Sequence, residues 1–252
     1  MKLRILGCSG GIGGAAKTTA FLLDGHILID AGTGLGSLSL QDMAAIDHVF
    51  LTHSHFDHIA CLPMLLDSVM SLRAHPVHVH ALPETIEALR LHVFNWHIWP
   101  DFTLIPDETR PVLHFVPMLE GECHRVGHLA LTALPAHHTV PAIGFQIDNG
   151  HASLVFSGDT LGGEDFWRAI NAIENLRALI IETAFPEREE ALARRSRHLC
   201  PSLLRRELAR LESCPEILIT HLKPADAELI MREVLQSGLL VRELQQDQTL
   251  QF

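Results

Sequence analysis

The chain of 252 residues is long enough for one substantial domain or two small ones, and its 47% apolar residues can build a sizeable core. A formal net charge of −11 argues against a protein that holds nucleic acid through a broad basic surface. The five cysteines are scattered, odd in number and without a CxxC pair, which excludes a disulfide framework and a thiolate zinc site.

Residues 1–11 contain two basic residues and are not expected to be a signal peptide. They lack an apolar stretch of the length that a signal peptide requires. No run elsewhere in the chain reaches the roughly 18 apolar residues that cross a bilayer. Residues 2–6 instead predict a first strand that runs into a glycine loop. We therefore expect a soluble, cytoplasmic protein without a membrane partner.

The glycine loop at residues 7–19 is a poor match to the nucleotide-binding loops. A P-loop needs glycine before its lysine, but Ala16 precedes Lys17 here. Gly11 to Ala16 fits the dinucleotide-binding pattern GxGxxA, but both this motif and the P-loop need a following helix. The next segment, TTAFLLDGHILID, predicts a hairpin around an Asp24-Gly25 turn instead. We expect the loop to lie at the rim of a functional site, where glycine lets the backbone approach a substrate.

Short apolar segments dominate the first half of the chain, whereas strands and helices alternate in the second half. The expected strands are residues 2–6, 19–23, 26–30, 47–51, 77–80, 112–117, 129–134, 143–148, 153–156, 178–181 and 216–220. The expected helices are residues 61–73, 83–94, 164–175, 188–211 and 224–237. With no linker in sight, we predict one α/β domain over residues 1–252, with two sheets, outer helices and a helical insert at about 60–110.

The segment LTHSHFDHIA, residues 51–60, crowds three histidines and an aspartate at the end of an expected strand. His53 and His55 alternate, so an extended backbone sends both side chains to one side. Asp57 and His58 follow where the chain turns into a helix. One tetrahedral zinc ion does not need so many ligands from one segment. The segment therefore suits two metal ions roughly 3.5 to 4 Å apart.

Further ligand-type residues follow three other apolar strands. They are His137 and His138 after residues 129–134, Asp159 after residues 153–156, and His221 after residues 216–220. A single histidine at a strand end is unremarkable, but metal-ligand side chains at four separate strand ends indicate a common site.

Together, THSHFDH, the later histidine, SGDT and ITHLKP resemble the metallo-β-lactamase superfamily over nearly the whole chain. The resemblance implies a four-layer αββα sandwich with a dinuclear metal site. By this match one metal would take His53, His55 and His138. The other would take Asp57, His58 and His221, with Asp159 as the bridge. Asp30 would support the ligands from behind.

The choice between His137 and His138 rests on the residues that follow. HTVPAIGF resembles the stretch after the ligand in the phosphodiesterase-type branch of the superfamily, which favours His138 over His137. The same branch is suggested by Glu182, at a strand end, and His198, which lies just before a helix. There the histidine would protonate the leaving alkoxide, and the glutamate would orient it. The alternative is a solvated histidine in a charged loop.

Residues 81–102, ALPETIEALRLHVFNWHIWPDF, are similar to the corresponding stretch of class II cyclic nucleotide phosphodiesterases. Asn95, Trp96 and Trp99 are candidates for substrate contacts, although most aromatic side chains of this stretch are expected to pack against the domain. The stretch HLCPSLLRREL departs from its counterpart at Cys200, where the family has threonine.

We therefore expect a dinuclear metal-dependent phosphodiesterase that opens 3′,5′-cyclic nucleotides, cAMP or cGMP, to 5′-monophosphates. The expected metal is zinc, with manganese and iron as alternatives. The expected catalytic residues are Asp57, Asp159, Glu182 and His198. A small cyclic nucleotide is the expected partner, without nucleic acid or membrane, and a homodimer is in keeping with the family. The alternatives are a ribonuclease Z-like tRNA 3′-endonuclease, a thioesterase or lactonase, and a metal-binding sensor without turnover.

Overall fold

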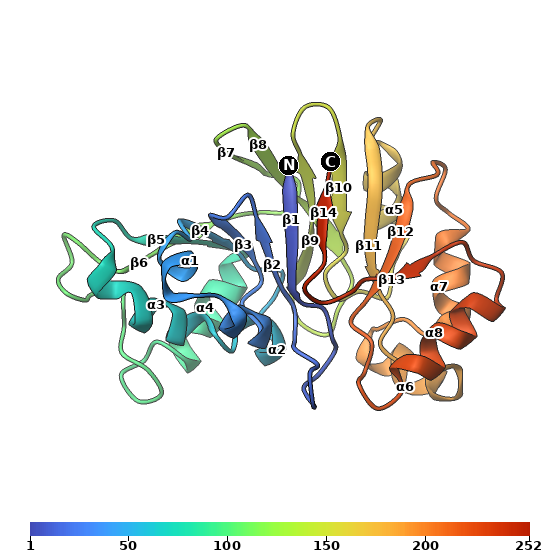
Figure 1. Ribbon diagram of the computed structural model, residues 1–252, viewed down its shortest axis with the longest axis horizontal. Coiled ribbons are helices and arrows are strands. Elements are labelled where there is room, and N and C mark those ends of the chain that lie inside the picture. Colours follow the sequence, from blue (N-terminus) through green and yellow to red (C-terminus); the bar gives the residue numbers. More distant parts are fainter. The chain divides into compact units, whose positions relative to one another are not determined.

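The computed structural model describes all 252 residues, which form two compact units. The first unit consists of residues 1–7, 17–119 and 246–251, and the second of residues 8–16, 120–245 and 252. Each unit is built on its own seven-stranded sheet (Figure 1). None of the helices combines the length and the apolar character that a membrane span requires. The single domain over residues 1–252 stays a prediction.

The sheet of the first unit has the strand order β14-β1-β2-β3-β4-β5-β6. Its strands are β1 (Lys2–Gly7), β2 (Ala20–Leu23), β3 (Ile27–Ile29), β4 (His48–Phe50), β5 (Val77–Ala81), β6 (Leu113–Pro117) and β14 (Thr249–Gln251). β2 and β3 form the predicted antiparallel hairpin, whose turn residues Asp24 and Gly25 both have positive φ angles. From β3 to β6 all neighbours are parallel, so the carboxyl ends of these strands share one edge.

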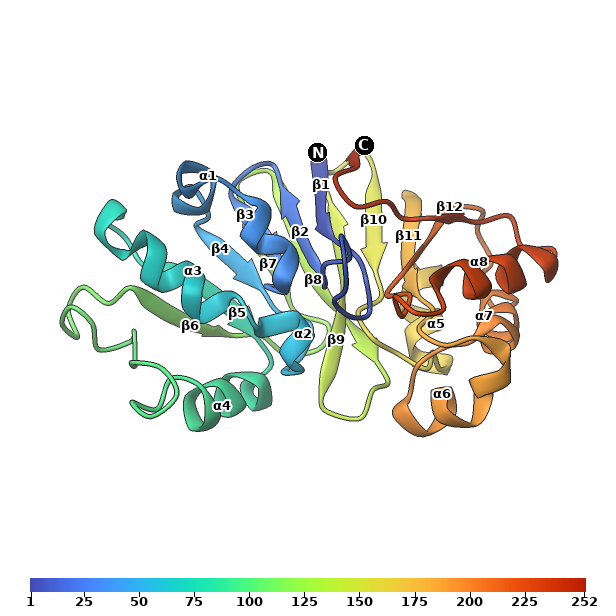
Figure 2. The same cartoon turned by 60° about the horizontal axis from the view of Figure 1, so that its bottom comes forward.

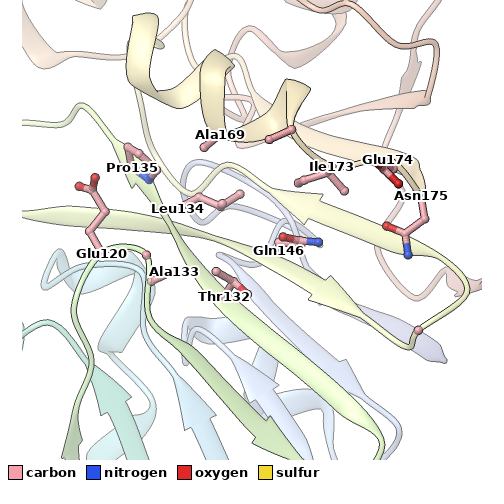
Figure 3. A pocket seen from close by; sticks show the side chains of 13 residues that line it. Glu120, Thr132, Ala133, Leu134, Pro135, Gln146, Ala169, Ile173, Glu174 and Asn175 are labelled. Atoms are coloured by element: carbon pink, nitrogen blue, oxygen red, sulfur yellow. The ribbon is translucent and has the colours of Figure 1, made fainter.

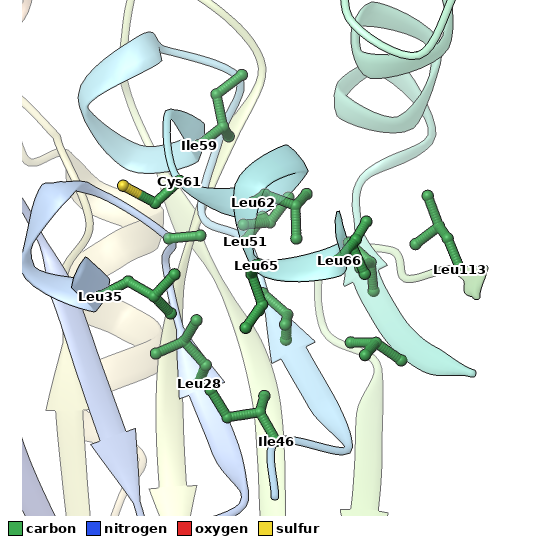
Figure 4. Packing of buried hydrophobic residues seen from close by; sticks show 14 of the residues in the cluster. Leu28, Leu35, Ile46, Leu51, Ile59, Cys61, Leu62, Leu65, Leu66 and Leu113 are labelled. Carbon is green, nitrogen blue, oxygen red and sulfur yellow. The ribbon is translucent and has the colours of Figure 1, made fainter. Parts of the chain in front are cut away.

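Helices cover one face of this sheet. They are α1 (Leu40–Ala44), α2 (Phe56–Ile59), α3 (Leu62–Val69) and α4 (Pro83–His92), with 3-10 turns at Thr33–Ser37 and Met70–Leu72. Leu62, Leu65 and Leu66 of α3 belong to one buried cluster with Leu51 and Leu113 (Figure 4). The predicted insert at 60–110 contains α3 and α4 but also β5, which is an inner strand of the sheet.

The sheet of the second unit has the order β13-β12-β11-β10-β9-β8-β7. Its strands are β7 (Cys123–Val126), β8 (Leu129–Ala136), β9 (Ala142–Asp148), β10 (Ser153–Phe156), β11 (Leu176–Glu182), β12 (Glu216–Thr220) and β13 (Arg242–Glu243). β9 is antiparallel to both β8 and β10, whereas β10, β11 and β12 are mutually parallel. The strands β8, β10, β11 and β12 therefore end at the same edge.

The second unit contains α5 (Glu164–Asn171), α6 (Glu190–Ser196), α7 (Pro201–Leu208) and α8 (Ala227–Gln236), with a 3-10 turn at Glu187–Glu189. Figures 1 and 2 both show α7 and α8 side by side. Their apolar faces join Trp167 of α5 in one buried cluster with Ile181 and Ile219 of the sheet.

The predicted continuous helix over residues 188–211 is wrong, because the chain leaves the helix between α6 and α7. Arg197 has a left-handed φ of 55°, which ends α6. Pro201 then occupies the first turn of α7, where its missing N–H costs no hydrogen bond. His198 consequently lies on a short extended connection and not on a helix face.

Candidate metal centre and acid–base pair

In the first unit, the candidate ligands follow β4. Because β3 and β4 are parallel, Asp30 after β3 and His53 after β4 leave the sheet at the same edge. His53 and His55 offer ligand atoms within 4.8 Å of each other, and so do Asp57 and His58. The Nε2 atom of His58 lies 3.9 Å from Oδ2 of Asp57. His53 and His58 are fully buried, whereas Asp57 is partly exposed.

Asp30 and Thr52 orient two of these imidazoles. Nδ1 of His58 donates to Oδ2 of Asp30 at 2.7 Å. The Thr52 hydroxyl donates to the same carboxylate at 2.9 Å, so its oxygen accepts from Nδ1 of His53 at 2.9 Å. In both rings Nε2 is then the nitrogen that a metal ion would use. Burial raises the pKa of Asp30, against the opposing effects of His58 and Thr52. Sequence reasoning missed Thr52, whose only signal is its place directly before His53.

Gly32 allows the segment after β3 to pack under the turn that carries Asp57. A Cβ atom at Gly32 would overlap the carbonyl oxygen of Asp57 and the hydroxyl of Thr18. The backbone N–H of Ala31 also donates to the carbonyl of His58 at 2.6 Å. The Asp57–His58 turn is therefore held by backbone contacts as well as by the side chain of Asp30.

In the second unit, Asp159 lies between two candidate histidine ligands. Its Oδ2 atom is 4.0 Å from Nε2 of His138, and its Oδ1 atom is 3.3 Å from Nδ1 of His221. All three side chains are buried. They come from the ends of β8, β10 and β12, which share one edge because these strands run in the same direction.

The two neighbouring histidines after β8 have different surroundings. The half-exposed imidazole of His137 pairs with Asp165 at 2.6 Å. The side chain of His138 is buried, and its Nδ1 donates to the carbonyl of Arg197 at 3.3 Å, so Nε2 is directed toward Asp159. This geometry favours His138 as the ligand.

Arg197 contacts His138 through a second bond that sequence reasoning also missed. The Arg197 guanidinium donates to the backbone carbonyl of His138, while the Arg197 carbonyl accepts from the His138 ring. The left-handed conformation of Arg197 belongs to the same turn that ends α6. The sequence contains no local signal for this contact, since the two residues are 59 positions apart.

Glu182 and His198 form a buried hydrogen-bonded pair. Oε1 of Glu182 accepts from Nδ1 of His198 at 2.7 Å and from the backbone N–H of Thr160 at 3.0 Å, while Oε2 accepts from the N–H of Leu199 at 3.2 Å. Ligand atoms of Asp159, Glu182 and His198 all lie within 4.8 Å of one another. The predicted pair therefore lies beside the candidate bridging carboxylate.

Burial and mutual contact shift the pKa values of both Glu182 and His198. Burial lowers the pKa of His198, but the charge and hydrogen bond of Glu182, aided by Asp159, raise it by more, so the pKa lies above its ordinary value. Burial raises the pKa of Glu182, against the opposing effect of the His198 imidazole. A protonated His198 is thus stabilised by the carboxylate that orients it.

The glycine loop contacts His221 closely. A Cβ atom at Gly10 would overlap the carbonyl oxygen of His221, and Nζ of Lys223 donates to the Gly10 carbonyl at 2.6 Å. The carbonyl of Cys8 accepts from the backbone N–H of His221 at 2.8 Å. Position 10 therefore needs glycine so that the loop can pack closely against His221. This packing accounts for the glycine without a nucleotide-binding motif.

Three further residues were singled out in the sequence as candidates for substrate contact. The amide of Asn95 is used in its own turn, accepting from the N–H groups of His97 and Ile98. Trp99 packs partly buried against the core, whereas Trp96 is 61% exposed. Of the three, Trp96 alone presents a large free ring surface, and its contact with a substrate stays a prediction.

Cys200 is fully buried, with Sγ 3.5 Å from Oγ of Ser202, and burial raises the pKa of its thiol. The thiol therefore sits in packed surroundings at the start of α7. A raised pKa keeps it in the neutral, weakly reactive form.

A cavity of about 710 Å³ in the second unit lies over β8, β9 and α5 (Figure 3). It is lined by residues such as Glu120, Gln146 and Glu174, and by none of the candidate ligands. Its two glutamates disfavour a phosphate ester. We therefore locate the candidate chemistry at the strand ends and not in this cavity.

Each unit thus contains clustered imidazole nitrogens and carboxylate oxygens. Nitrogen and oxygen donors of this kind suit zinc, manganese or iron. The buried imidazoles of His53, His58 and His138 are each held through Nδ1, which leaves Nε2 as the ligand atom. The residues present therefore fit a divalent metal centre.

Comparisons with known proteins identify a family and several relatives. A sequence model described as the Beta-lactamase superfamily domain matches residues 26–234. The chain is 25% identical to a probable 3′,5′-cyclic-nucleotide phosphodiesterase of Yersinia pestis, over 77% of this chain and 63% of that protein. It is 29% identical to ribonuclease BN of Cronobacter sakazakii, over 59% of this chain and 49% of that protein. The chain therefore spans less than two thirds of the length of either relative.

Solved structures show the same fold. Unliganded yeast PDE1 superposes with a TM-score of 0.78 at 20% identity, over 98% of both chains. The metallo-beta-lactamase fold protein YhfI from Bacillus subtilis gives a TM-score of 0.77 at 20% identity, over 99% of both chains. The fold class predicted from the sequence is confirmed.

Proposed function

Since the chain belongs to the metallo-β-lactamase superfamily of hydrolases, we propose that it is a metal-dependent phosphodiesterase that hydrolyses 3′,5′-cyclic nucleotides to 5′-monophosphates. The observation that carries the proposal is the buried Glu182–His198 pair, with its 2.7 Å hydrogen bond, beside Asp159. A proton donor at this place serves a reaction whose leaving group is a poor one, such as the ribose 3′ alkoxide.

We further propose that the candidate ligands of the two units combine to hold two divalent ions, with zinc expected first and manganese or iron as alternatives. One ion would be held by His53, His55 and His138, and the other by Asp57, His58 and His221, with Asp159 shared. Such ions lower the pKa of bound water and neutralise the growing charge on a phosphate. Asp30, Thr52 and Arg197 orient the imidazoles through their Nδ1 atoms.

The protein side chains divide the proton transfers between them. Asp57 and Asp159 are carboxylates that can accept a proton from the attacking water. His198 holds a proton on Nδ1 against Glu182, and its other ring nitrogen can donate to the departing 3′ oxygen. Glu182 fixes the orientation of the imidazole and stabilises its cationic form, because three donors hold the carboxylate in place.

A tRNA 3′-endonuclease of the ribonuclease Z kind is the second candidate, favoured by the ribonuclease BN relative. The net charge of −11 counts against it, because a tRNA ligand is held mainly through basic contacts to phosphates.

The exposed Trp96 near the end of α4 fits a nucleobase better than a thioester or a lactone, since a planar base stacks on an aromatic ring. We therefore propose a small cyclic nucleotide as substrate, and a homodimer as the assembly to be tested.

The test is hydrolysis of cAMP and cGMP by pure protein of known metal content, with wild type and His198→Ala compared. We expect the variant to keep its metal but to lose about 10²- to 10⁴-fold in rate on the cyclic nucleotides. On bis(p-nitrophenyl) phosphate, whose leaving group needs no proton, the loss should be much smaller. His151→Ala, an exposed histidine on the β9–β10 turn, is the control.

Two outcomes would contradict the proposal. Cleavage of the synthetic diester without cleavage of either cyclic nucleotide would support the metal centre but remove the substrate assignment, and tRNA precursors would be tested next. An equal loss on both kinds of substrate would remove the leaving-group role of His198.

A further inference from the structure

One face of the first sheet carries a cluster of histidines outside the candidate catalytic centre. On the parallel strands β4, β5 and β6, His48 is paired with His78, and His78 with His114. His80 follows on the same face of β5, because side chains two apart on a strand point the same way. The opposite face of these strands carries Val49 and Val79, which are part of the buried core.

His48 is at the centre of this cluster. Its Nδ1 atom lies 3.0 Å from Nε2 of His80. Its ring centroid lies 5.2 Å from that of His80 and 5.3 Å from that of His78, which in turn lies 5.3 Å from His114. His80 is buried and stacks on Phe50 at 4.2 Å, whereas His48 and His78 are partly exposed. The cluster therefore has a buried inner ring, that of His80, and an outer side that solvent partly reaches.

The separation of the two nitrogens matches that of a pair of metal ligands. Two imidazole nitrogens bound tetrahedrally to one zinc ion at about 2.0 to 2.1 Å lie roughly 3.3 Å apart. The 3.0 Å between His48 and His80 is close to this distance. An ion could thus take the place of the proton that the two nitrogens share, with a small rotation of either ring, once that proton has moved to the other nitrogen of the imidazole that carries it.

The electrostatic surroundings keep the imidazoles available. Burial lowers the pKa of His48, and repulsion from the His78 imidazole lowers it further. The pKa of His78 is lowered in the same way by burial and by His114. Metal binding requires the neutral imidazole, so these groups do not need to lose a proton first at neutral pH. Arg73 is nearby, but its guanidinium is paired with Asp47 at 2.7 Å.

We propose that His48, His78 and His80 form a second binding site for a divalent transition-metal ion such as Zn²⁺, separate from the candidate catalytic ligands. His48 and His80 provide the first two nitrogens, and His78, on the partly exposed side, provides the third after a rotation of its ring. Water completes the coordination, because this side of the cluster is open to solvent. Imidazole ligands of this kind select zinc, nickel or copper over magnesium and calcium.

The test uses the whole protein with its high-affinity sites already loaded with zinc and the excess removed. Equilibrium dialysis against added Zn²⁺, followed by elemental analysis, then counts the further ions. We expect wild type to bind about one more zinc per chain than His78→Asn or His48→Asn. His151→Asn, the matched exposed histidine, should bind as wild type does. Equal uptake by wild type and both cluster variants would overturn the proposal.

A measurement on wild type alone guards against variants that fold poorly. Ring-nitrogen NMR signals of His48, His78 and His80 should shift when Zn²⁺ is added to the zinc-loaded protein, whereas that of His151 should not. Unchanged signals of the three clustered histidines would reject the site. Neither experiment measures hydrolysis. A negative result would therefore reject the second metal site and leave the proposed phosphodiesterase activity untouched.

Discussion

The buried contact between Asp30 and His58 shows how one carboxylate orients a candidate metal ligand. The carboxylate accepts from Nδ1 of His58 at 2.7 Å and from both the N–H and the hydroxyl of Thr52. The hydroxyl of Thr52 in turn orients His53. One carboxylate thus fixes the tautomers of two imidazoles, and removing its charge should weaken a metal centre that uses both.

Asp30→Asn is therefore expected to lower metal affinity about 10- to 100-fold, because the amide cannot supply the same charge to His58. Metal content after dialysis against a graded chelator measures the effect. Asp165→Asn is the matched control, since Asp165 also pairs with a histidine, His137, but on an exposed surface. Equal metal retention by the two variants would contradict the role of Asp30.

At the scale of elements, the break between α6 and α7 lies beside both a candidate metal ligand, His138, and the candidate acid, His198. The left-handed Arg197 ends α6, contacts His138 with both its guanidinium and its carbonyl, and directly precedes His198. A continuous helix over residues 188–211 would have carried His198 on a helix face. The proline at the start of α7 and the turn before it therefore position a candidate ligand and a candidate acid together.

Arg197→Lys is expected to weaken metal retention several-fold and to lower the rate on both cyclic nucleotides and the synthetic diester. Lysine keeps the charge but lacks the planar guanidinium that reaches the His138 carbonyl. The same retention and rate assays measure it, with Arg195→Lys on the exposed side of α6 as control. If Arg197→Lys behaved like that control, the guanidinium would not be needed. The bond from the His138 ring to the Arg197 carbonyl would then be enough to hold His138.

At the scale of the whole molecule, the histidine cluster on β4, β5 and β6 is expected to make the stability of the fold depend on pH. The pKa values of His48 and His78 are lowered in the folded chain from an ordinary 6.5. Asp47 opposes this effect, whereas burial, the neighbouring imidazoles and Arg73 produce it. The unfolded chain therefore binds more protons than the folded chain once the pH falls below about 6.5.

Because of this difference, the two histidines leave stability unaffected above pH 6.5 and reduce it progressively as the pH falls through and below that value. Urea unfolding of metal-free protein at a series of pH values measures the slope. His78→Asn should flatten the slope between neutral and mildly acidic pH relative to wild type, and His151→Asn should not. Identical slopes for all three proteins would contradict the lowered pKa of His78.

Local patterns were sufficient for much of the fold and the candidate site. The hairpin around Asp24-Gly25 and the strand ends before His53, Asp159 and His221 were predicted from such patterns, whereas the pairing of Glu182 with His198 was expected only from the family resemblance. Strand periodicity and turn chemistry act over a few residues, so they can be recognised in the sequence. The short strands β7, β13 and β14 were missed, because such segments are strands only when a neighbouring strand offers hydrogen bonds.

The sequence by itself determined the types of the candidate ligands and the strand ends on which they lie, since both follow from neighbouring residues. Only the tertiary structure decided what holds them: Thr52 against His53, Arg197 against His138 and Gly10 against His221. It also decided that His48, His78 and His80 meet on one sheet face. Arg197 and His138 are 59 positions apart along the chain, and Gly10 and His221 come from its opposite ends. Strand register and helix breaks bring such residues together, and no local pattern specifies either.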